Sequence, residues 1–490
     1  MTAGGHESGH RTYSPIAKAG AGERLASNPD FLEVVSLAPP AWSSVGTAPG
    51  VGKMKRGEWI ITAGAETARI RWLCSVGLAL IAASSAPAET PPDPLTLAWC
   101  LDRAEVTNPD LDVARTSVEA AEERVYPAGA LPDPRFRYEL SNLPTGDFDL
   151  DSTPLSGQQL GLSQRLPFPG LLGRQLDAAR AAADASEEEL GDESRRIAAA
   201  VERAWVELGF AQRALDVTLE NIDLLRQLAK IAEAKYQVGQ GLQQDVIRAQ
   251  VALTELLDER LLREAAIRAT EARLANLLDL TPETPFSRTA SLREAAPLPE
   301  LPSLLERLES TSPRLRALAQ RVEEAEHRKS VAQLEGYPDF DFGLGYRIRK
   351  RVMGDPVDGD DFLGAGVTIR LPVDRRKWRS HVAERDALLR RSEAQYRRFR
   401  AALRGSLRAR HADLERADRE IALLENGLLP QARQSLDSSR SGYEVDKVDF
   451  LSLVDSQVRL LNAQLRLERS IADRRAAFAA VEATVGEPLR

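Results

Sequence analysis

The feature that most restricts the fold is a strict two-residue alternation of apolar and polar side chains between Tyr337 and Pro372. From Phe340 to Ile348 every second residue is large and apolar, and the residues between them are Asp, Gly or Arg. An acidic turn follows, and the alternation resumes from Leu363 to Leu371. A period of two places one set of side chains on each face of an extended strand, so this stretch predicts a β-hairpin.

A second copy of the hairpin lies about 204 residues earlier, in residues 133–140 and 159–167. Each run has about ten residues, the length that a tilted strand needs to cross a bilayer. A soluble hairpin on a helical core explains one such hairpin equally well, but the duplication favours membrane strands. The residues expected to face lipid are Phe136, Tyr138, Leu140, Phe340, Phe342, Leu344, Tyr346, Val367 and Ile369.

The N-terminal region indicates export. A positively charged segment precedes the apolar run 73–83, which ends in small residues and an Ala-Pro-Ala cleavage site. We interpret residues 54–88 as a signal peptide and residues 1–53 as an extension from a misassigned start codon. Cys74 lacks the small residues that precede a lipoprotein cysteine, which argues against a lipid anchor. No later apolar run is long enough for a spanning helix.

The rest of the chain repeats one pattern: a helix, two strands, a very long helix, a turn and a returning helix. Asn108-Pro109 matches Ser312-Pro313 at an offset of 204, and SQRLP at 163–167 matches TIRLP at 368–372 at an offset of 205. The expected boundaries are 89–280 for the first repeat (strand pair 133–167, helical hairpin 171–280), 281–302 for a Pro-rich linker, and 303–490 for the second repeat (strand pair 339–372, helical hairpin 375–485).

The long helices exceed what a globular core requires. Small or apolar residues recur every seven positions from Leu176 to Ala232, a pattern typical of coiled coils. A helix from Gly173 to Tyr236 would be about 95 Å long. Glycines at Val238-Gly239-Gln240-Gly241 predict the end of this helix, and Tyr443–Asp449 is the matching turn of the second repeat.

Four strands cannot close a membrane barrel, because an open edge leaves unpaired backbone groups in hydrocarbon. We therefore expect a mainly α protein with membrane β-structure, in which a trimer closes twelve strands, three times four, above a helical barrel. The residues expected at the junctions between strands and helices are Pro167, Pro169, Gly170 and Pro372.

Four motifs, taken together and in their order along the chain, carry a family resemblance. They are the NP-x-L segment at 108–111, LSQRLPFPG at 162–170, and the turn sequences at 234–250 and 441–457. Together they resemble the TolC-type outer-membrane efflux proteins, over about residue 95 to the C-terminus. The LSQ-x-L-x-FPG form is most similar to the heavy-metal, CzcC/CusC-like branch.

The resemblance implies a homotrimer in the outer membrane of a Gram-negative bacterium, with a twelve-stranded barrel and a large periplasmic helical tunnel. It implies a passive exit duct, which receives its cargo from an inner-membrane transporter, of the RND type, through a periplasmic adaptor (membrane fusion protein). Heavy-metal cations are the implied cargo, and drugs or a type I secreted protein are alternatives. A periplasmic coiled-coil adaptor or scaffold remains the rival interpretation, which retention in the outer membrane after a salt wash would reject.

The resemblance also implies functional positions at the helical turns. The gate candidates are Asp245, Ser452 and Asp455. The best-known relative has an acidic residue at the position of Ser452, so this chain departs from the family there. An aspartate near the start of a helix also complements the helix dipole, which is the alternative explanation for Asp245 and Asp455. The residues expected to contact an adaptor are Tyr236, Val238, Gly239, Gly241, Val246, Gln250, Tyr443, Val445, Lys447 and Gln457. For Tyr236 and Tyr443, packing over a helix end is the alternative.

The remaining charged residues point to no chemistry. Strand-loop acids could attract cations at an external mouth or only keep the loops soluble: Asp147, Asp149, Asp151, Asp355, Asp358, Asp360 and Asp361. His327, His381 and His411 lack metal-ligand spacing, and no nucleophile or phosphate-binding motif occurs. The net charge of −8 is spread along the chain without a basic stripe for nucleic acid. We expect no catalytic site, metal site or cofactor.

Overall fold

Long α-helices dominate the computed structural model, which describes residues 91–146, 148–150, 152–293, 297, 300–487 and 489. The expected extension at 1–53 lies outside the described residues, as do the signal peptide and the loop acids Asp147 and Asp151. None of the helices in the described part combines the length and the apolar character that crossing a membrane requires.

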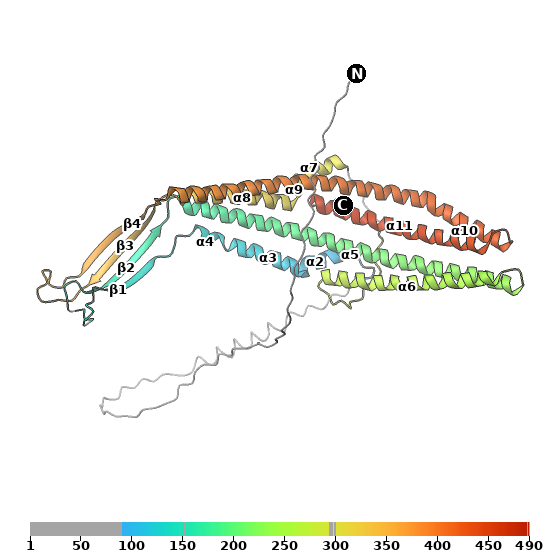
Figure 1. Ribbon diagram of the computed structural model, residues 1–490, viewed down its shortest axis with the longest axis horizontal. Helices are drawn as coiled ribbons and strands as arrows, with labels where there is room; N and C mark the ends of the chain where they lie inside the picture. The colour runs from blue at the N-terminus through green and yellow to red at the C-terminus, as the bar shows by residue number, and fades with distance from the viewer. Residues whose placement is uncertain are drawn as a thin grey trace, which may run out of the picture. The chain divides into compact units, whose positions relative to one another are not determined.

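Each repeat contains the expected order of elements (Figure 1). The first repeat consists of α2 (Leu97–Thr107), α3 (Pro109–Glu122), α4 (Val125–Gly129), β1 (Arg135–Ser141), β2 (Gly157–Leu166), α5 (Leu171–Gln237) and α6 (Gln243–Leu277). The second consists of α7 (Leu301–Thr311), α8 (Pro313–Leu334), β3 (Asp339–Ile348), β4 (Phe362–Arg370), α9 (Arg375–Leu423), the π-helical turn η1 (Leu424–Leu428), α10 (Leu429–Glu444) and α11 (Phe450–Val485).

The two strand pairs form one antiparallel sheet in the order β1-β2-β3-β4. Strands β2 and β3 come from different repeats and pair along their length, with Leu162 opposite Leu344. Strands β1 and β4 are the edges of this sheet. Figure 1 shows the sheet at one end of α5 and α9, and the helical turns at the other end.

The Asn-Pro and Ser-Pro breaks organise each repeat in the same way. The Asn108 side chain caps α3 by accepting a hydrogen bond from the Asp110 N–H, and its Nδ2 donates to the Leu277 carbonyl at 2.9 Å. In the second repeat, Thr311 Oγ1 donates to the Val485 carbonyl. Because helix ends leave carbonyl groups unpaired, each break fixes the end of the returning helix in its own repeat.

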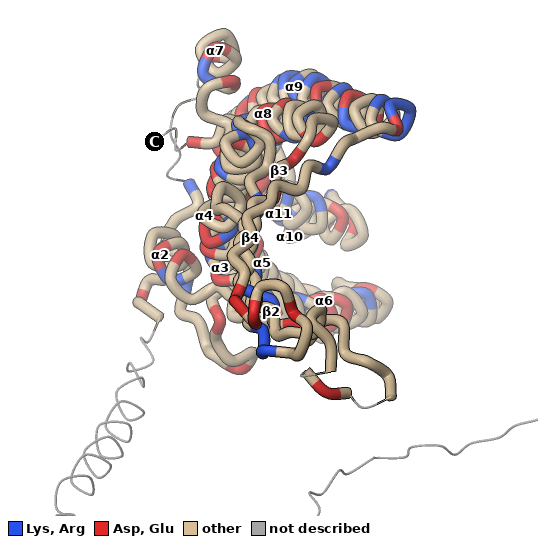
Figure 2. The backbone as a smooth tube through the Cα atoms, turned by 90° about the vertical axis from the view of Figure 1, so that its left-hand side faces the viewer, with Lys and Arg blue, Asp and Glu red and all other residues tan. Residues whose placement is uncertain are grey.

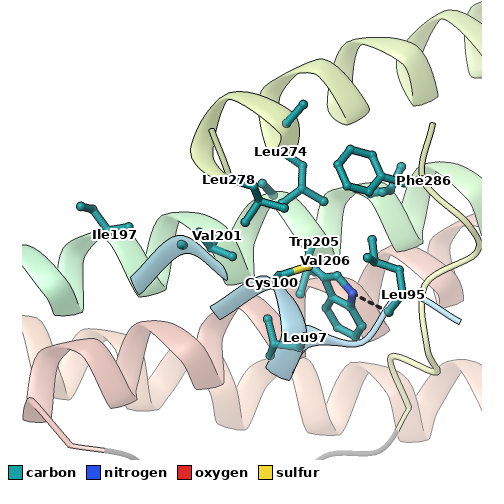
Figure 3. Packing of buried hydrophobic residues seen from close by; sticks show 14 of the residues in the cluster. Leu95, Leu97, Cys100, Ile197, Val201, Trp205, Val206, Leu274, Leu278 and Phe286 are labelled. Atoms are coloured by element: carbon teal, nitrogen blue, oxygen red, sulfur yellow. Dashed lines mark hydrogen bonds between the residues drawn. The ribbon is translucent and has the colours of Figure 1, made fainter. Parts of the chain in front are cut away.

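A cluster of buried apolar residues joins α2, α5, the end of α6 and the linker (Figure 3). The Trp205 indole Nε1 donates a hydrogen bond of 3.0 Å to the Leu95 carbonyl. Phe286, in the expected linker, is buried in this cluster, and Arg288 forms a two-point ion pair with Asp216 of α5. The first part of the linker is therefore packed against α5.

Helix α5 is the centre of the helical layer. Near the sheet, α3 packs against α5, α5 against α8, and α8 against α9. Toward the helical turns, α6 and α11 pack against α5, and α11 also packs against α9 and α10. Helices α3 and α6 therefore lie on one edge of the layer, and α9 and α10 lie on the other.

Candidate functional site

The two helical turns reverse the chain by similar hydrogen bonds. In the first turn the Lys235 carbonyl accepts from the N–H groups of Gln240 and Gly241, at 2.9 and 3.0 Å, and Gly239 has a φ of +73°. In the second turn the Gly442 carbonyl accepts from the Lys447 N–H at 2.8 Å. A Cβ on Gly442 would lie 2.5 Å from the Val448 side chain, so this turn requires glycine there.

Lys235 connects the two turns. Its buried ammonium donates to the Tyr443 carbonyl at 2.6 Å and to Asp446 Oδ1 at 2.5 Å. It also lies 4.9 Å from the centroid of the Tyr443 ring, within the range of a cation–π contact. Lys235 was not predicted as a functional residue from the sequence. The one sequence feature that could have indicated it is its charge, three positions after Ala232, the last residue of the seven-residue pattern.

Tyr443 makes a second connection between the hairpins. Its hydroxyl donates to Asp245 Oδ2 at 3.4 Å, and its ring packs edge-on against Phe450 with centroids 5.3 Å apart. Burial, and then the Asp245 carboxylate, raise the pKa of Tyr443 to about 12. The phenol therefore stays protonated at neutral pH and remains a donor to Asp245.

The three gate candidates have different surroundings within one chain. Asp245 is buried in the first turn of α6 and faces Tyr443. Ser452 is exposed and donates to Asp449, and Asp455 is exposed and accepts from Arg459 Nε at 2.9 Å. Asp245 thus has a structural partner across the hairpins, whereas Asp455 is bound only by its own helix.

Two of the expected adaptor contacts are buried in this chain. Tyr443 packs as described above, and Gln457 Nε2 donates to Asn221 Oδ1 at 3.1 Å inside the helical layer. Both side chains lie where the second hairpin packs against α5, so within one chain they contact neighbouring helices. Tyr236, in contrast, is exposed. Of the two tyrosines, only Tyr443 therefore packs over a helix end, which was the alternative explanation for both.

The sheet has one apolar and one polar face. Residues opposite each other in an antiparallel pair share a face, and the register places all nine residues expected to face lipid on the same side. Eight of the nine are exposed, and only Phe340 is half-buried. Arginines and glycines dominate the other face, including Arg135, Arg137, Arg165, Arg347 and Arg370.

A charged cluster closes the helix-side end of the sheet. The buried Asp339 carboxylate accepts from Arg165 and also pairs with Arg370. Phe168, which lies between the junction residues Pro167 and Pro169 in sequence, stacks on Tyr337 with ring centroids 4.6 Å apart. A cleft of about 910 Å³ opens here, lined by Tyr126, Pro127, Arg165, Pro167, Arg370 and Trp378 among others.

The acids of the loop between β3 and β4 are largely paired. Arg349 binds Asp355 at 2.6 Å, Arg351 binds Asp358 at 2.8 Å, and Asp361 accepts from the Tyr346 hydroxyl at 2.5 Å. Burial raises the pKa of Asp355, but the hydrogen bonds from Arg349 and from two backbone N–H groups outweigh burial, and the pKa lies below its usual value. These pairs weaken the cation-attracting field that an unpaired acidic cluster would create.

No group of three or more His, Cys, Asp or Glu side chains that could hold a metal ion occurs in the part of the chain described above. His381 hydrogen-bonds Glu335 at 3.1 Å, a contact between α9 and the end of α8. This contact links α9 to α8 near the sheet.

The family model for "Outer membrane efflux protein" matches residues 100–279 and 304–487, one block in each repeat. The chain belongs to the outer membrane efflux protein family. Members of this family are channels of the outer membrane, so the chain is a passive efflux channel and not an enzyme.

One relative is similar to this outer membrane efflux protein in sequence, and two solved structures are similar to it in fold. The cobalt-zinc-cadmium resistance protein CzcC of Cupriavidus metallidurans is 23% identical over 76% of this chain and 85% of its own length. The solved channel CusC has a TM-score of 0.70 at 16% identity, covering 80% of this chain and 92% of its own. VceC from Vibrio cholerae has a TM-score of 0.68 at 18% identity, covering 80% and 97%.

Proposed function

We propose that three copies of this chain form the outer-membrane exit duct of a tripartite heavy-metal efflux pump. The observation that carries this proposal is the exposed apolar face that runs across all four strands. Phe136, Leu344, Leu363 and Val367 are each more than half exposed on this face. Such a face is stable in contact with lipid and costs free energy in contact with water.

The edges of the sheet support a trimer. Strands β1 and β4 have unpaired backbone groups along their outer sides, which hydrocarbon does not tolerate. Pairing β4 of one copy with β1 of the next satisfies these groups, and three copies supply twelve strands, three times the four of one chain. The edge helices are equally unpartnered, because Val251, Leu261, Leu262 and Leu423 are more than half exposed.

The helical turns are the proposed periplasmic end. We assign the adaptor contact to the expected tip residues other than the buried Tyr443 and Gln457, which leaves Tyr236, Val238, Gly239, Gly241, Val246, Gln250, Val445 and Lys447. The gate remains assigned to Asp245, Ser452 and Asp455, with Asp245 acting through its contact with Tyr443. The implied partners are an adaptor and an inner-membrane transporter.

Heavy-metal cations are the proposed cargo because CzcC is named as a cobalt, zinc and cadmium resistance protein. The chain itself acts as a conduit, so its cargo depends on the transporter that delivers it. A strain that lacks this chain should lose tolerance to cobalt, zinc or cadmium and keep its tolerance to dyes. Unchanged metal tolerance with increased dye sensitivity would assign drugs as the cargo instead.

The assembly is tested by the mass of the mature protein, extracted in detergent from the outer-membrane fraction after a salt wash. Light scattering, corrected for bound detergent, should give three chain masses. A protein that the salt wash releases, or that extracts as a monomer or dimer, would leave too few strands to close the barrel. That result would favour the periplasmic scaffold interpretation.

A further inference from the structure

All eight charged side chains of the four strands lie on the polar face of the sheet. The register places them on the same side as the strand glycines, opposite to the apolar face. Five of them are arginines and three are acids, a net charge of +2 on this face, whereas the whole chain has −8. Figure 2 views the chain from the sheet end, with Lys and Arg in blue and Asp and Glu in red. The sheet thus has a positive face in a chain that is negative overall.

The three acids lie at the two ends of this face. The helix-side end balances two arginines with two acids: Arg165 and Arg370 with Asp339 and Asp341. Nearer the strand loops, Arg347 and Glu139 lie in one row of the register, each opposite Gln159. Both ends of the polar face are therefore close to neutral.

The positive charge is concentrated in the middle of the face. Arg135 and Arg137 of β1 are both exposed, and the residues in the same two rows of the register are Ser or Gly: Ser163, Gly343, Gly366, Gly161, Gly345 and Gly364. No carboxylate in the described chain forms an ion pair with Arg135. Arg137 comes within 3.9 Å of Glu139 only, and 77% of its side chain is exposed. We call Arg135 and Arg137 the arginine belt.

The space above the glycines of these rows is open. A Cβ on Gly366 would meet nothing within 4 Å, and on Gly343 or Gly364 its nearest neighbour would be 3.9 Å away. The long side chains of the arginine belt therefore stand beside a surface without side chains. A solute that moves along this face meets the two guanidinium groups before it meets any carboxylate in these rows.

A neighbouring copy would not neutralise the belt. Strand β1 is an edge of the sheet, so in the proposed trimer the strand beside it is β4 of another copy. Strand β4, FLGAGVTIR, contains no acid. Three copies would therefore bring six arginines, two from each chain, to the middle of the lumen without adding a carboxylate next to them.

Guanidinium groups favour one class of solute. They stay charged at every physiological pH, and their N–H donors match the oxygens of carboxylates and phosphates. Rings of Arg or Lys occur in pores that pass anions, and a lumen surrounded by lipid strengthens their field because the wall has a low dielectric constant.

We propose that the arginine belt makes the strand barrel selective for anions. This inference rests on the proposed function and narrows its cargo: the barrel passes solutes with carboxylate or phosphate groups more readily than bare metal cations. A divalent metal would then leave more readily when an anionic ligand has reversed its charge. Arg135 and Arg137 are the residues that determine this specificity.

The charge preference can be measured with a cysteine beside the belt. Ser163 lies directly opposite Arg135, and Ser163→Cys changes only the γ atom. Its reaction with a sulfonate-bearing methanethiosulfonate should be roughly tenfold faster than with a trimethylammonium-bearing one, after each rate is divided by that with 2-mercaptoethanol. Outer-membrane fragments are used, so that the reagents reach the barrel even if the helical turns are closed. The native Cys100 is buried, and burial raises its pKa to about 12, so it reacts slowly.

Variants of the belt separate charge from structure. In the Ser163→Cys chain, Arg135→Gln with Arg137→Gln should lower the preference to about twofold or less, and Arg135→Lys with Arg137→Lys should keep it. Raising the salt to about 1 M should also lower it, because the Debye length falls to about 3 Å. The control removes two exposed cations from a helix, Arg226→Gln with Lys230→Gln, and should leave the preference unchanged.

The neighbouring residue distinguishes failure of this inference from failure of the proposed function. Leu162, which is 52% exposed, lies on the apolar face. In a lipid-embedded barrel Leu162→Cys should react with neither charged reagent. If it stays unreactive while Ser163→Cys shows no preference or prefers the cation, the belt is overturned and the channel stands. If Leu162→Cys reacts readily with both reagents, the apolar face is in water and both proposals are overturned.

Permeation gives an independent measurement. In planar bilayers with a KCl gradient, Arg135→Gln with Arg137→Gln should shift the reversal potential from its wild-type value toward the potassium equilibrium potential. The double Lys variant and the helix control should not shift it. A reversal potential that is the same in the Gln variant and the wild type would overturn the role of the arginine belt in selecting the cargo.

Discussion

The two helical hairpins are copies of one pattern, yet equivalent residues have opposite environments. Tyr236 precedes the first turn with 46% of its surface exposed, and Tyr443, 207 positions later, is only 5% exposed. Gln250 is exposed, and its equivalent Gln457 is buried and bonded to Asn221. The duplication therefore preserved the elements but not the surroundings of their side chains.

The difference follows from the place of each returning helix. Helix α11 packs against α5, α9 and α10, so its residues are enclosed by neighbours on several sides. Helix α6 packs mainly against α5 and leaves its outer side open. The second hairpin is therefore a structural centre of the chain, whereas the first hairpin provides an edge that another copy can cover.

The largest expected effect of this asymmetry is on stability at the start of the returning helices. Phe450 is fully buried at the first position of α11, and the equivalent Gln243 of α6 is exposed. Phe450→Ala should lower the free energy of unfolding by about 3–5 kcal/mol, because it removes buried apolar surface and leaves a cavity. Gln243→Ala should change it by less than about 0.5 kcal/mol. Equal losses in denaturant unfolding would contradict the asymmetry.

A smaller loss is expected at Lys235, the residue through which the first hairpin holds the second. Lys235→Ala removes one donor from the Tyr443 carbonyl, which keeps the backbone N–H of Asp446, and leaves the Asp446 carboxylate without its cation. Because Asp446 is itself exposed, we expect a loss of about 1–2 kcal/mol, as for one hydrogen-bonded charge. Lys230→Ala, on the exposed side of the same helix, is the control. A loss as small as that of the control would mean that the turns are held by other contacts.

The elements of both hairpins follow from local sequence signals. The alternation of apolar and polar residues predicted strands β1 to β4. The Asn-Pro, Ser-Pro and glycine signals predicted where the helices begin and where the chain turns. All of these signals come from residues that are close in sequence. The π-helical turn η1 was not predicted, although a nearby residue indicates it. Pro430 follows this turn and cannot donate a hydrogen bond to the preceding turn of helix.

The environments of the same elements could not be predicted in this way. The pairing of β2 with β3, the burial of Tyr443 but not Tyr236, and the contact of Lys235 with Asp446 all join residues far apart in sequence. They depend on which helix occupies the centre of the layer, and that is decided by contacts between the two repeats. The assignment of Tyr443 and Gln457 to partner contact stays a prediction, and the turn sequences gave no indication of their burial within one chain.

The hydroxyl of Tyr443 is expected to contribute less than Lys235 does. Tyr443→Phe should cost about 0.5–1.5 kcal/mol at pH 7, because Asp245 loses one hydrogen bond. Tyr236→Phe, at the exposed equivalent position, should cost almost nothing. Equal costs for the two variants would show that the contact with Asp245 does not stabilise the turns.

The pH dependence of Tyr443 sharpens this test. Its pKa in the folded chain, about 12, exceeds the ordinary value of 10.0, so between these values the folded chain holds a proton that the unfolded chain has lost. The stabilising contribution is therefore complete below pH 10 and declines as the pH rises toward 12. Tyr443→Phe should remove this alkaline decline, whereas Tyr236→Phe should retain it.

The smallest effect on stability, and the most direct test of gating, is expected at Asp455. This side chain is exposed and contacts only Arg459 of its own helix, so Asp455→Ala should change the free energy of unfolding by less than about 0.5 kcal/mol. If three copies of Asp455 bind cations and hold the turns closed, the same variant should nevertheless raise the resting conductance in planar bilayers. Asp245→Ala should raise conductance together with a loss of stability, because it breaks the contact with Tyr443. An unchanged conductance for Asp455→Ala, with a rise for Asp245→Ala, would place the gate at the joint between the hairpins and not in a ring of exposed charge.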